Sequence, residues 1–194
     1  MPKPQIPTHA GSKIVREFVE RLIVSSNHRL KYVDVPLHRP GGGRTRLKPD
    51  VVYTSGKPGA RTPSGPVKYV YTTDSEGRLA SAHARPLQLP EKMKRGSHYR
   101  RTPGKEAGDH AGHLIADLFG GSGKLDNLVS QLSDVNLRSM ANLERDWARR
   151  IANGESFDLD IVVRYAGDGT RPIGFRVVET CDDGRSYIHS IMNN

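Results

Sequence analysis

Three polar side chains in the second half of the chain have the types and the spacing that hydrolysis of a phosphodiester requires. They are His113, Asn136 and, eight residues further on, Glu144. An imidazole titrates near neutral pH, so His113 can act as the base that activates water. Amide and carboxylate oxygens are ligands that Mg²⁺ prefers, and Mg²⁺ needs few of them from the protein. The three residues therefore predict a hydrolytic site built around one hard metal ion.

Asn136 and Glu144 fall in a segment with the apolar spacing of an amphipathic helix, residues 136–152, which Asn153 and Gly154 end. Eight residues of α-helix make about 2.2 turns and rise about 12 Å, so the two side chains emerge on roughly the same side but cannot both reach one ion directly. Helical side chains lean toward the N-terminus, which brings Glu144 back toward Asn136. We expect Asn136 to bind the metal directly and Glu144 to bind it through a water molecule. A helix start near the site also favours an anionic substrate.

Each of these residues has an ordinary structural interpretation as well. His113 can be a buried histidine that a backbone group satisfies. Asn136 can be only the N-cap of its helix, and Glu144 can pair with Arg138 or Arg145 on the solvent-exposed side. All three residues in this order on a basic chain favour the catalytic interpretation over three separate structural ones.

A zinc site is a second chemical alternative. His110 and His113 are three residues apart, with Asp109 beside them. A further histidine, His98, lies upstream. A tetrahedral zinc site takes three or four ligands, mostly nitrogen or sulfur. The chain has a single cysteine, Cys181, so cysteine ligands are missing and Mg²⁺ is favoured.

The overall charge narrows the choice of partners. A formal net charge of +9 and a pI near 9.8 point to nucleic acid, an anionic membrane or an acidic protein. A basic run just before the histidine motif is the best candidate for a surface that follows phosphates, with a solvated loop as the alternative. Its cations are Lys92, Lys94, Arg95, Arg100, Arg101 and Lys105.

Nothing in the sequence indicates a membrane span or an export signal. No stretch approaches transmembrane length, and the opening residues MPKPQ do not begin the continuous apolar segment of a secretory signal. The lone Cys181 cannot form an internal disulfide. If the protein leaves its cell, we expect something other than a signal peptide to carry it.

The remaining pattern predicts an α+β protein. An amphipathic helix is expected over residues 13–25, with Ser12 as its N-cap. Extended segments are expected over residues 67–73, 79–89, 157–165, 173–180 and 187–191. Residues 36–66 are rich in Gly, Pro, Arg and Lys and are interpreted as loop, with one short strand at 51–54.

These elements suggest two parts. Residues 1–66 would form an N-terminal helix plus a basic arm rich in Gly and Pro, and residues 67–194 would form the domain that carries the three polar side chains.

Three stretches of the chain resemble one known family: residues 108–121 (GDHAGHLIADLFGG), 125–131 (LDNLVSQ) and 136–147 (NLRSMANLERDW). Together they are similar to the DNA/RNA non-specific endonucleases, the ββα-metal nucleases with a His-Asn-Glu site. The branch that they resemble most includes toxin domains at the C-termini of secreted bacterial effectors. The likeness extends over roughly residues 67–191 and leaves the first 66 residues unexplained.

The resemblance implies a role for each matched residue. His113 matches the general base, Asn136 the metal-binding asparagine, and Glu144 the ligand that acts through water. Asn127 matches an asparagine that supports the site through hydrogen bonds. The implied fold is α+β with a ββα-metal nuclease core, in which a two-stranded ribbon and a helix hold one Mg²⁺ against an antiparallel sheet.

The chain departs from the family pattern next to the base. Many members read Asp-Arg-Gly-His there, whereas the matching four residues of this chain read His-Ala-Gly-His. The arginine that would stabilise phosphate charge is therefore absent. We expect Arg100, Arg101 or Arg171 to bind phosphate in its place. Asp109 or His110 is expected to orient the site.

We therefore expect a Mg²⁺-dependent endonuclease, with Mn²⁺ able to substitute, that cleaves DNA and also RNA with little sequence preference. The resemblance implies a bacterial toxin domain, delivered out of the producing cell within a larger effector and active in the target cell. It also implies an acidic immunity protein that blocks the site. Two other classes stay open: a basic nucleic-acid-binding module without catalysis, and an interaction protein whose basic surface meets an acidic partner.

Overall fold

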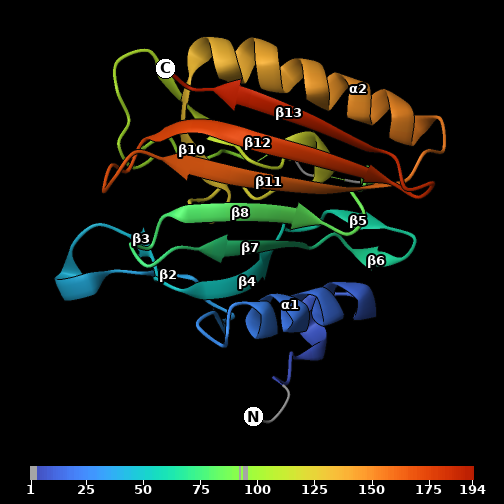
Figure 1. Cartoon of the computed structure of the whole chain (residues 1–194), viewed down its shortest axis with the longest axis horizontal. Helices are drawn as coiled ribbons and strands as arrows, with labels where there is room; N and C mark the ends of the chain where they lie inside the picture. Colours follow the sequence, from blue (N-terminus) through green and yellow to red (C-terminus); the bar gives the residue numbers. More distant parts are fainter. Residues whose placement is uncertain (1–3, 92, 94–95) are drawn as a thin grey trace.

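A seven-stranded sheet forms the centre of the molecule. The computed structural model describes residues 4–91, 93 and 96–194. The strand order is β1-β4-β7-β8-β11-β12-β13, and within this part of the chain only the β1–β4 pair of that sheet is parallel (Figure 1). The strands are β1 (Lys31–Tyr32), β4 (Val51–Ser55), β7 (Tyr69–Thr73), β8 (Leu79–Ala84), β11 (Phe157–Tyr165), β12 (Pro172–Cys181) and β13 (Ser186–Met192).

The turn between β7 and β8 shows how local sequence sets the strand pairing. The Asp74 carboxylate accepts hydrogen bonds from the backbone N–H groups of Glu76 and Arg78, at 3.0 and 2.9 Å. Gly77 has φ +71°, and a Cβ there would lie 2.7 Å from the carbonyl oxygen of Leu47. A side chain at this position would be strained on both counts, so glycine closes the hairpin.

Helix α1 (Lys13–Ser25) packs on one face of the sheet and lies next to β4 in Figure 1. The Ser12 hydroxyl accepts a hydrogen bond from the backbone N–H of Val15, which caps the first turn. The apolar stripe of the helix is buried against the sheet. This small core contains Val15, Val19, Ile23 and Leu30 with Val52 of β4 and Val70 of β7.

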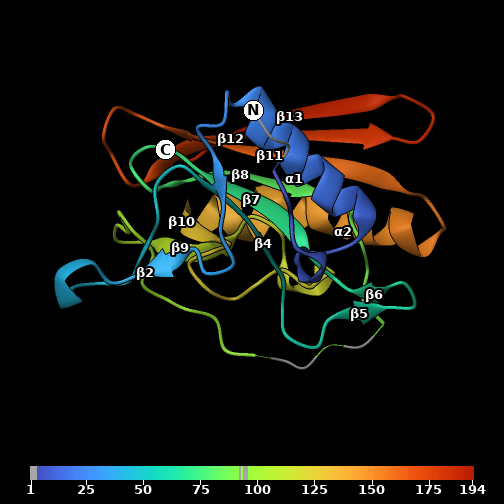
Figure 2. The same ribbon diagram turned by 90° about the horizontal axis from the view of Figure 1, so that it is seen from below.

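The opposite face carries a ribbon followed by a helix. Strands β9 (Asp109–His113) and β10 (Leu128–Leu132) pair antiparallel, and a π-helix, η4 (Val135–Met140), leads into α2 (Ala141–Ala152). Figure 2 shows the ribbon near the start of α2. Trp147 and Phe119 of this unit are buried in one core with Tyr53, Tyr71 and Phe157 of the sheet. The ββα unit is therefore held on the sheet by aromatic packing.

Shorter elements complete the fold. They are η1 (Thr8–Ala10), β2 (Leu37–His38), η2 (Pro40–Gly42), β3 (Arg46–Leu47), β5 (Arg61–Thr62), β6 (Gly65–Pro66) and η3 (Asp117–Phe119). The β2–β3 hairpin, with η2 at its tip, extends beyond the body of the molecule (Figure 1). None of the described helices is long and apolar enough to cross a bilayer.

The α+β class and most predicted elements are confirmed. The helix at residues 13–25 and the strand at residues 157–165 have the predicted bounds. The helix predicted over 136–152 is present, but its first part is π-helical. Strand β4 pairs with β7, so part of the basic arm enters the main sheet, and the division at residue 66 stays a prediction. The predicted cations Lys92, Lys94 and Arg95 lie outside the described residues.

The packing of α1 predicts unequal effects for two isoleucines on the same helix. Ile23 is 4% exposed, whereas Ile14 is 57% exposed. We expect Ile23→Ala to lower the free energy of unfolding by about 2–4 kcal/mol, because it removes buried methyl groups and leaves a cavity. Ile14→Ala is the matched control and should change it by less than about 0.5 kcal/mol. Urea denaturation measures both, and equal effects would show that α1 is not packed on the sheet.

Candidate active site

His113 lies at the end of β9, opposite Leu128 of β10. Its ring is partly buried, and its Nε2 atom is fully enclosed without a hydrogen-bond partner in the described part of the chain. This burial lowers the pKa of His113 to about 4, and the charges of His98 and Lys57 act in the same direction. At neutral pH the imidazole is therefore uncharged and able to accept a proton.

A segment of the basic run lies across this ring. The His98 and His113 ring centroids are 5.6 Å apart. The backbone N–H of Tyr99 donates to the carbonyl oxygen of Gly123 at 2.8 Å, and a Cβ on Gly123 would lie 3.2 Å from the Cα of His98. The absence of a side chain at Gly123 thus lets His98 approach the site.

Lys57 is a cation near His113 that the sequence analysis missed. Its side chain is 8% exposed, and its ammonium group donates to both carboxylate oxygens of Asp117, at 2.6 and 2.7 Å. The Lys57 charge lowers the pKa of His113, while the Asp117 charge raises it. No sequence signal pointed to Lys57, because it follows β4, far from the histidine motif along the chain.

Asn136 lies in η4 and contacts His110. Its Nδ2 atom is 3.2 Å from Nδ1 of His110, so the amide donates to the unprotonated ring nitrogen. The Oδ1 atom of Asn136 makes no hydrogen bond to any described residue, which leaves this oxygen available to a metal ion. His110 thereby orients the amide.

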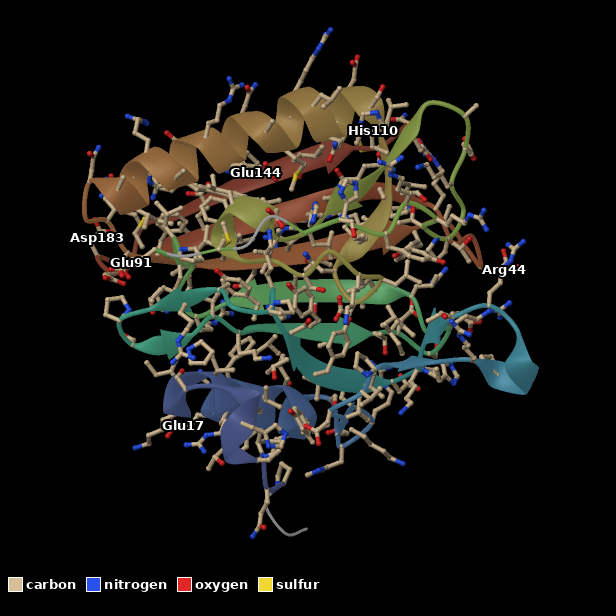
Figure 3. The ribbon with its side chains drawn as sticks, turned by 180° about the vertical axis from the view of Figure 1, so that it is seen from behind. Glu17, Arg44, Glu91, His110, Glu144 and Asp183 are labelled. Atoms are coloured by element: carbon tan, nitrogen blue, oxygen red, sulfur yellow. The ribbon has the colours of Figure 1, made fainter. Side chains whose placement is uncertain are left out.

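Glu144 lies in the first turn of α2, on the side of the helix that faces the rest of the fold, and His110 lies toward the start of the same helix (Figure 3). The carboxylate is partly buried and has no ion pair or hydrogen bond within the described residues. Burial alone raises the pKa of Glu144 to about 7. The alternative of an ion pair with Arg138 or Arg145 is not seen in the described structure, since Arg138 reaches Asp134 and Arg145 reaches Asn142.

The π-helix changes the angle between Asn136 and Glu144. In an α-helix each residue turns by about 100°, so eight residues overshoot two full turns by about 80°. Hydrogen bonds in a π-helix reach one residue further, so each turn holds more residues and each residue turns by less. Because Asn136 to Met140 is π-helical, the overshoot shrinks and the two side chains come closer to one face. The expectation of an α-helix throughout this segment was wrong.

Asn127 holds the loop between β9 and β10. It is fully buried, its Oδ1 accepts from the backbone N–H of Ile115 at 3.0 Å, and its Nδ2 donates to the carbonyl oxygens of Ile115 and Ser122, both at 2.8 Å. Its own carbonyl oxygen accepts from the N–H of Leu114 at 2.9 Å. A Cβ on Gly121 would lie 1.8 Å from the Ile115 carbonyl oxygen, so only glycine fits there. These bonds fix the position at which His113 leaves the ribbon.

The three arginines expected to bind phosphate have different surroundings. Arg171 donates to both carboxylate oxygens of Asp109 at 2.8 Å and to the carbonyl oxygen of Asn193, so its guanidinium is already engaged. This pair holds the pKa of Asp109 below its usual range. Arg100 and Arg101 are exposed and have no ion pair among the described residues. They are the better placed of the three to contact phosphate, and this role stays a prediction.

Gln131 is a further buried polar residue of the ribbon. Its Nε2 atom lies 3.4 Å from the carbonyl oxygen of His113, and its Oε1 atom is buried without a partner among the described residues. A Cβ on Gly112 would lie 2.2 Å from the Gln131 side chain. Gly112, which precedes His113, is therefore the residue from which this packing could have been predicted.

Comparisons with known sequences identify the family of this chain. Residues 61–183 match the model of the DNA/RNA non-specific endonuclease family. Type VII secretion system protein EssD of Staphylococcus aureus (strain USA300) is 34% identical over 157 residues, 76% of this chain and 24% of EssD. Probable deoxyribonuclease RhsA of Dickeya dadantii (strain 3937) is 28% identical over 96 residues, 50% of this chain and 7% of RhsA. The chain thus spans about a quarter or less of the length of these relatives.

The fold is also similar to that of a solved nuclease structure. The structure of Sda1 nuclease with a bound zinc ion has a TM-score of 0.57 to this chain, covers 74% of this chain and 83% of its own, and is 15% identical. At this identity the likeness concerns the fold alone, and it agrees with a ββα unit on a mostly antiparallel sheet.

The unpaired carboxylate predicts a pH-dependent change in stability. The pKa of Glu144 is about 7 in the folded protein, above its value of 4.5 when unfolded, so the folded protein loses stability as pH rises from about 4.5 to 7. Glu144→Gln mimics the protonated form and removes this loss. In EDTA we expect equal stability of variant and wild type near pH 4, and a variant more stable by about 1–3 kcal/mol at pH 8.

Urea denaturation at both pH values measures this difference. His113 titrates in both proteins and cancels from the comparison. Glu91→Gln, at a carboxylate exposed to solvent, is the control and should show no growth of the difference with pH. An equal difference for Glu144→Gln at pH 4 and pH 8 would contradict the unpaired carboxylate.

Proposed function

The chain belongs to the DNA/RNA non-specific endonuclease family, and on this premise we propose that it is a divalent-metal-dependent endonuclease that hydrolyses DNA and also RNA with little sequence preference. One observation carries the proposal. A single ββα unit holds an uncharged histidine with an unpartnered Nε2 atom and a carboxylate without a counter-charge in the described residues. A base beside an anionic ligand is what metal-assisted hydrolysis needs.

The donor atoms of this chain fit a hard cation. Asn136 Oδ1 and the Glu144 carboxylate are oxygen donors without partners in the described residues, and they would hold the metal. The described residues contain no group of three or more His, Cys, Asp and Glu side chains that could bind an ion. Mg²⁺ suits such a site because it keeps several waters and needs few protein ligands, and Mn²⁺ can substitute. Sda1 nuclease is known with zinc, so the identity of the metal is part of the proposal.

Each residue of the site has its own role in the proposed reaction. His113 takes a proton from the attacking water, since its ring is uncharged at neutral pH. The metal, when bound, neutralises charge that develops on the phosphate. His110 orients the Asn136 amide, and Asp109 fixes Arg171 beside β9. Arg100 and Arg101 contact the substrate phosphates in place of the arginine missing from the motif.

The relatives suggest the biological setting. We propose that this nuclease is the toxin part of a larger bacterial effector, exported and active in a target cell, because EssD is named as a secretion system protein and the chain matches only 24% of it. An acidic immunity protein that covers the basic site would then protect the producing cell.

Removal of the proposed base should abolish cleavage without loss of the fold. We expect His113→Ala to lower kcat on supercoiled plasmid by about 10²–10⁴-fold, because general base catalysis contributes about that much. Affinity for DNA and the thermal midpoint should stay near wild type. His9→Ala, at an exposed histidine outside the site, is the control. A His113→Ala variant with wild-type turnover would rule out the proposed mechanism. Wild-type protein that binds plasmid without nicking it would indicate a non-catalytic module.

The metal requirement is tested with both nucleic acids. EDTA should stop the cleavage of plasmid and of total RNA, and Mg²⁺ or Mn²⁺ should restore it. Asn136→Ala should raise the Mg²⁺ concentration for half-maximal rate by about 10–100-fold, the range seen when groups that support a metal are removed. Asn142→Ala, at an exposed asparagine of the following helix α2, should leave it unchanged. Full activity in excess chelator would rule the metal out.

A further inference from the structure

A broad groove of about 1090 Å³ runs between the β2–β3 hairpin and residues 101–107. We propose that this groove, which we call the arginine groove, binds the phosphate backbone of the substrate beyond the scissile bond; the inference rests on the proposed nuclease function. Its cations are Arg39, Arg44, Arg46, Arg78, Arg101 and Lys105. They come from segments far apart in the sequence, so only the fold brings them together.

The β2–β3 hairpin forms one wall of the groove. Leu37 pairs with Leu47, and the Lys48 N–H donates to the Pro36 carbonyl oxygen at 2.8 Å, which closes the base of the hairpin. Across its tip, Arg39 Nε donates to the Thr45 hydroxyl at 3.1 Å. Figure 3 shows Arg44 projecting from this extended hairpin. The hairpin thus presents its arginines from an ordered element rather than from a loose loop.

The charge of the groove is not neutralised from within. Arg44, Arg46 and Arg101 are exposed and have no carboxylate within ion-pair distance in the described residues. Arg78 differs, because it pairs with Asp74 and donates to two backbone carbonyl oxygens, which makes it structural. Only two acidic residues, Glu76 and Glu106, are among the described groove residues. A surplus of unpaired guanidinium groups on facing walls suits a polyanion with closely spaced phosphates.

None of His113, Asn136 and Glu144 lines the groove, but two of its lining residues adjoin the candidate active site. Its floor includes Leu128, which pairs with His113 in the ribbon. Its wall includes Tyr99, next to His98, whose ring lies 5.6 Å from that of His113. Tyr99 is 45% exposed and offers an aromatic face for a base. A strand with its scissile phosphate at His113 can therefore continue into the groove.

The hairpin lies outside the family match. That match begins at residue 61, so Arg39, Arg44 and Arg46 belong to a part of the chain that the shared domain does not include. We infer that the N-terminal arm extends the substrate-binding surface and contributes affinity for long nucleic acid rather than chemistry. Such contacts lower KM without raising kcat.

The test compares two double variants that remove the same charge. Arg44→Ala/Arg46→Ala removes two groove cations, and Lys31→Ala/Arg164→Ala removes two exposed cations outside it. Affinity for a fluorescent oligonucleotide is measured in EDTA by anisotropy at several salt concentrations. The groove variant should bind about 10–100-fold more weakly at low salt. The slope of log affinity against log salt should also be smaller in magnitude by about 2, because each lost phosphate contact removes about 0.9 from that slope. The control should change less than twofold.

Cleavage supplies a second readout. The groove variant should show a raised KM for plasmid and an unchanged rate on a small p-nitrophenyl phosphodiester, which is too short to enter the groove. Unchanged oligonucleotide affinity and salt slope would overturn the proposal, even if wild type cleaves DNA. Weaker capture of an acidic protein partner with unchanged oligonucleotide affinity would overturn it too, in favour of protein docking. A groove variant that loses affinity while wild type fails to cleave would support the groove and reject the proposed nuclease function.

Discussion

The burial of a carboxylate without a counter-charge is the constraint on which the site depends. A charge removed from water and left unpaired is costly, so the group favours its neutral form instead. That is why the pKa of Glu144 rises to about 7 and why burial lowers the pKa of His113 to about 4. A cation bound beside Glu144 would restore the charged form and stabilise the fold at the same time. Metal affinity and stability are thus linked in this protein.

The core beneath α2 makes this cost tolerable. Trp147 lies three residues after Glu144 on the same helix, is 1% exposed, and packs against the Phe119 ring with centroids 6.2 Å apart. Each fully buried large apolar side chain contributes about 1.5–3 kcal/mol. The aromatic core therefore fixes α2 on the sheet, while Asn127 fixes the loop that leaves β9. The aromatic core thus holds Glu144 in place, and the hydrogen bonds of Asn127 hold His113 in place. Neither support depends on a contact between these two side chains.

Much of the fold was predictable because its signals are local. The alternation in residues 157–165 sets β11, and Ser12 followed by an apolar stripe sets α1. What escaped prediction depends on contacts between distant segments. The π-helix that turns Asn136 toward Glu144 has no periodic signature, and Lys57 reaches the neighbourhood of His113 only through the sheet. The three candidate residues were proposed from type and spacing, but the burial that shifts the pKa values of His113 and Glu144 came from the tertiary structure.

A second histidine shows why unpartnered atoms matter more than a familiar geometry. His83 Nε2 lies 2.7 Å from the Ser81 hydroxyl, and its Nδ1 contacts the Asp160 carboxylate, as in a Ser-His-Asp triad. Here every partner is already engaged: Ser81 also bonds Thr72, and Phe18 of α1 covers the His83 ring at 5.0 Å. Ser81 is 8% exposed and lies inside strand β8. Backbone N–H groups there bond to the neighbouring strands, so they are not available to stabilise an oxyanion. The same three residue types therefore link neighbouring strands of the sheet here, whereas His113, with an Nε2 atom that has no partner in the described residues, retains the capacity to accept a proton.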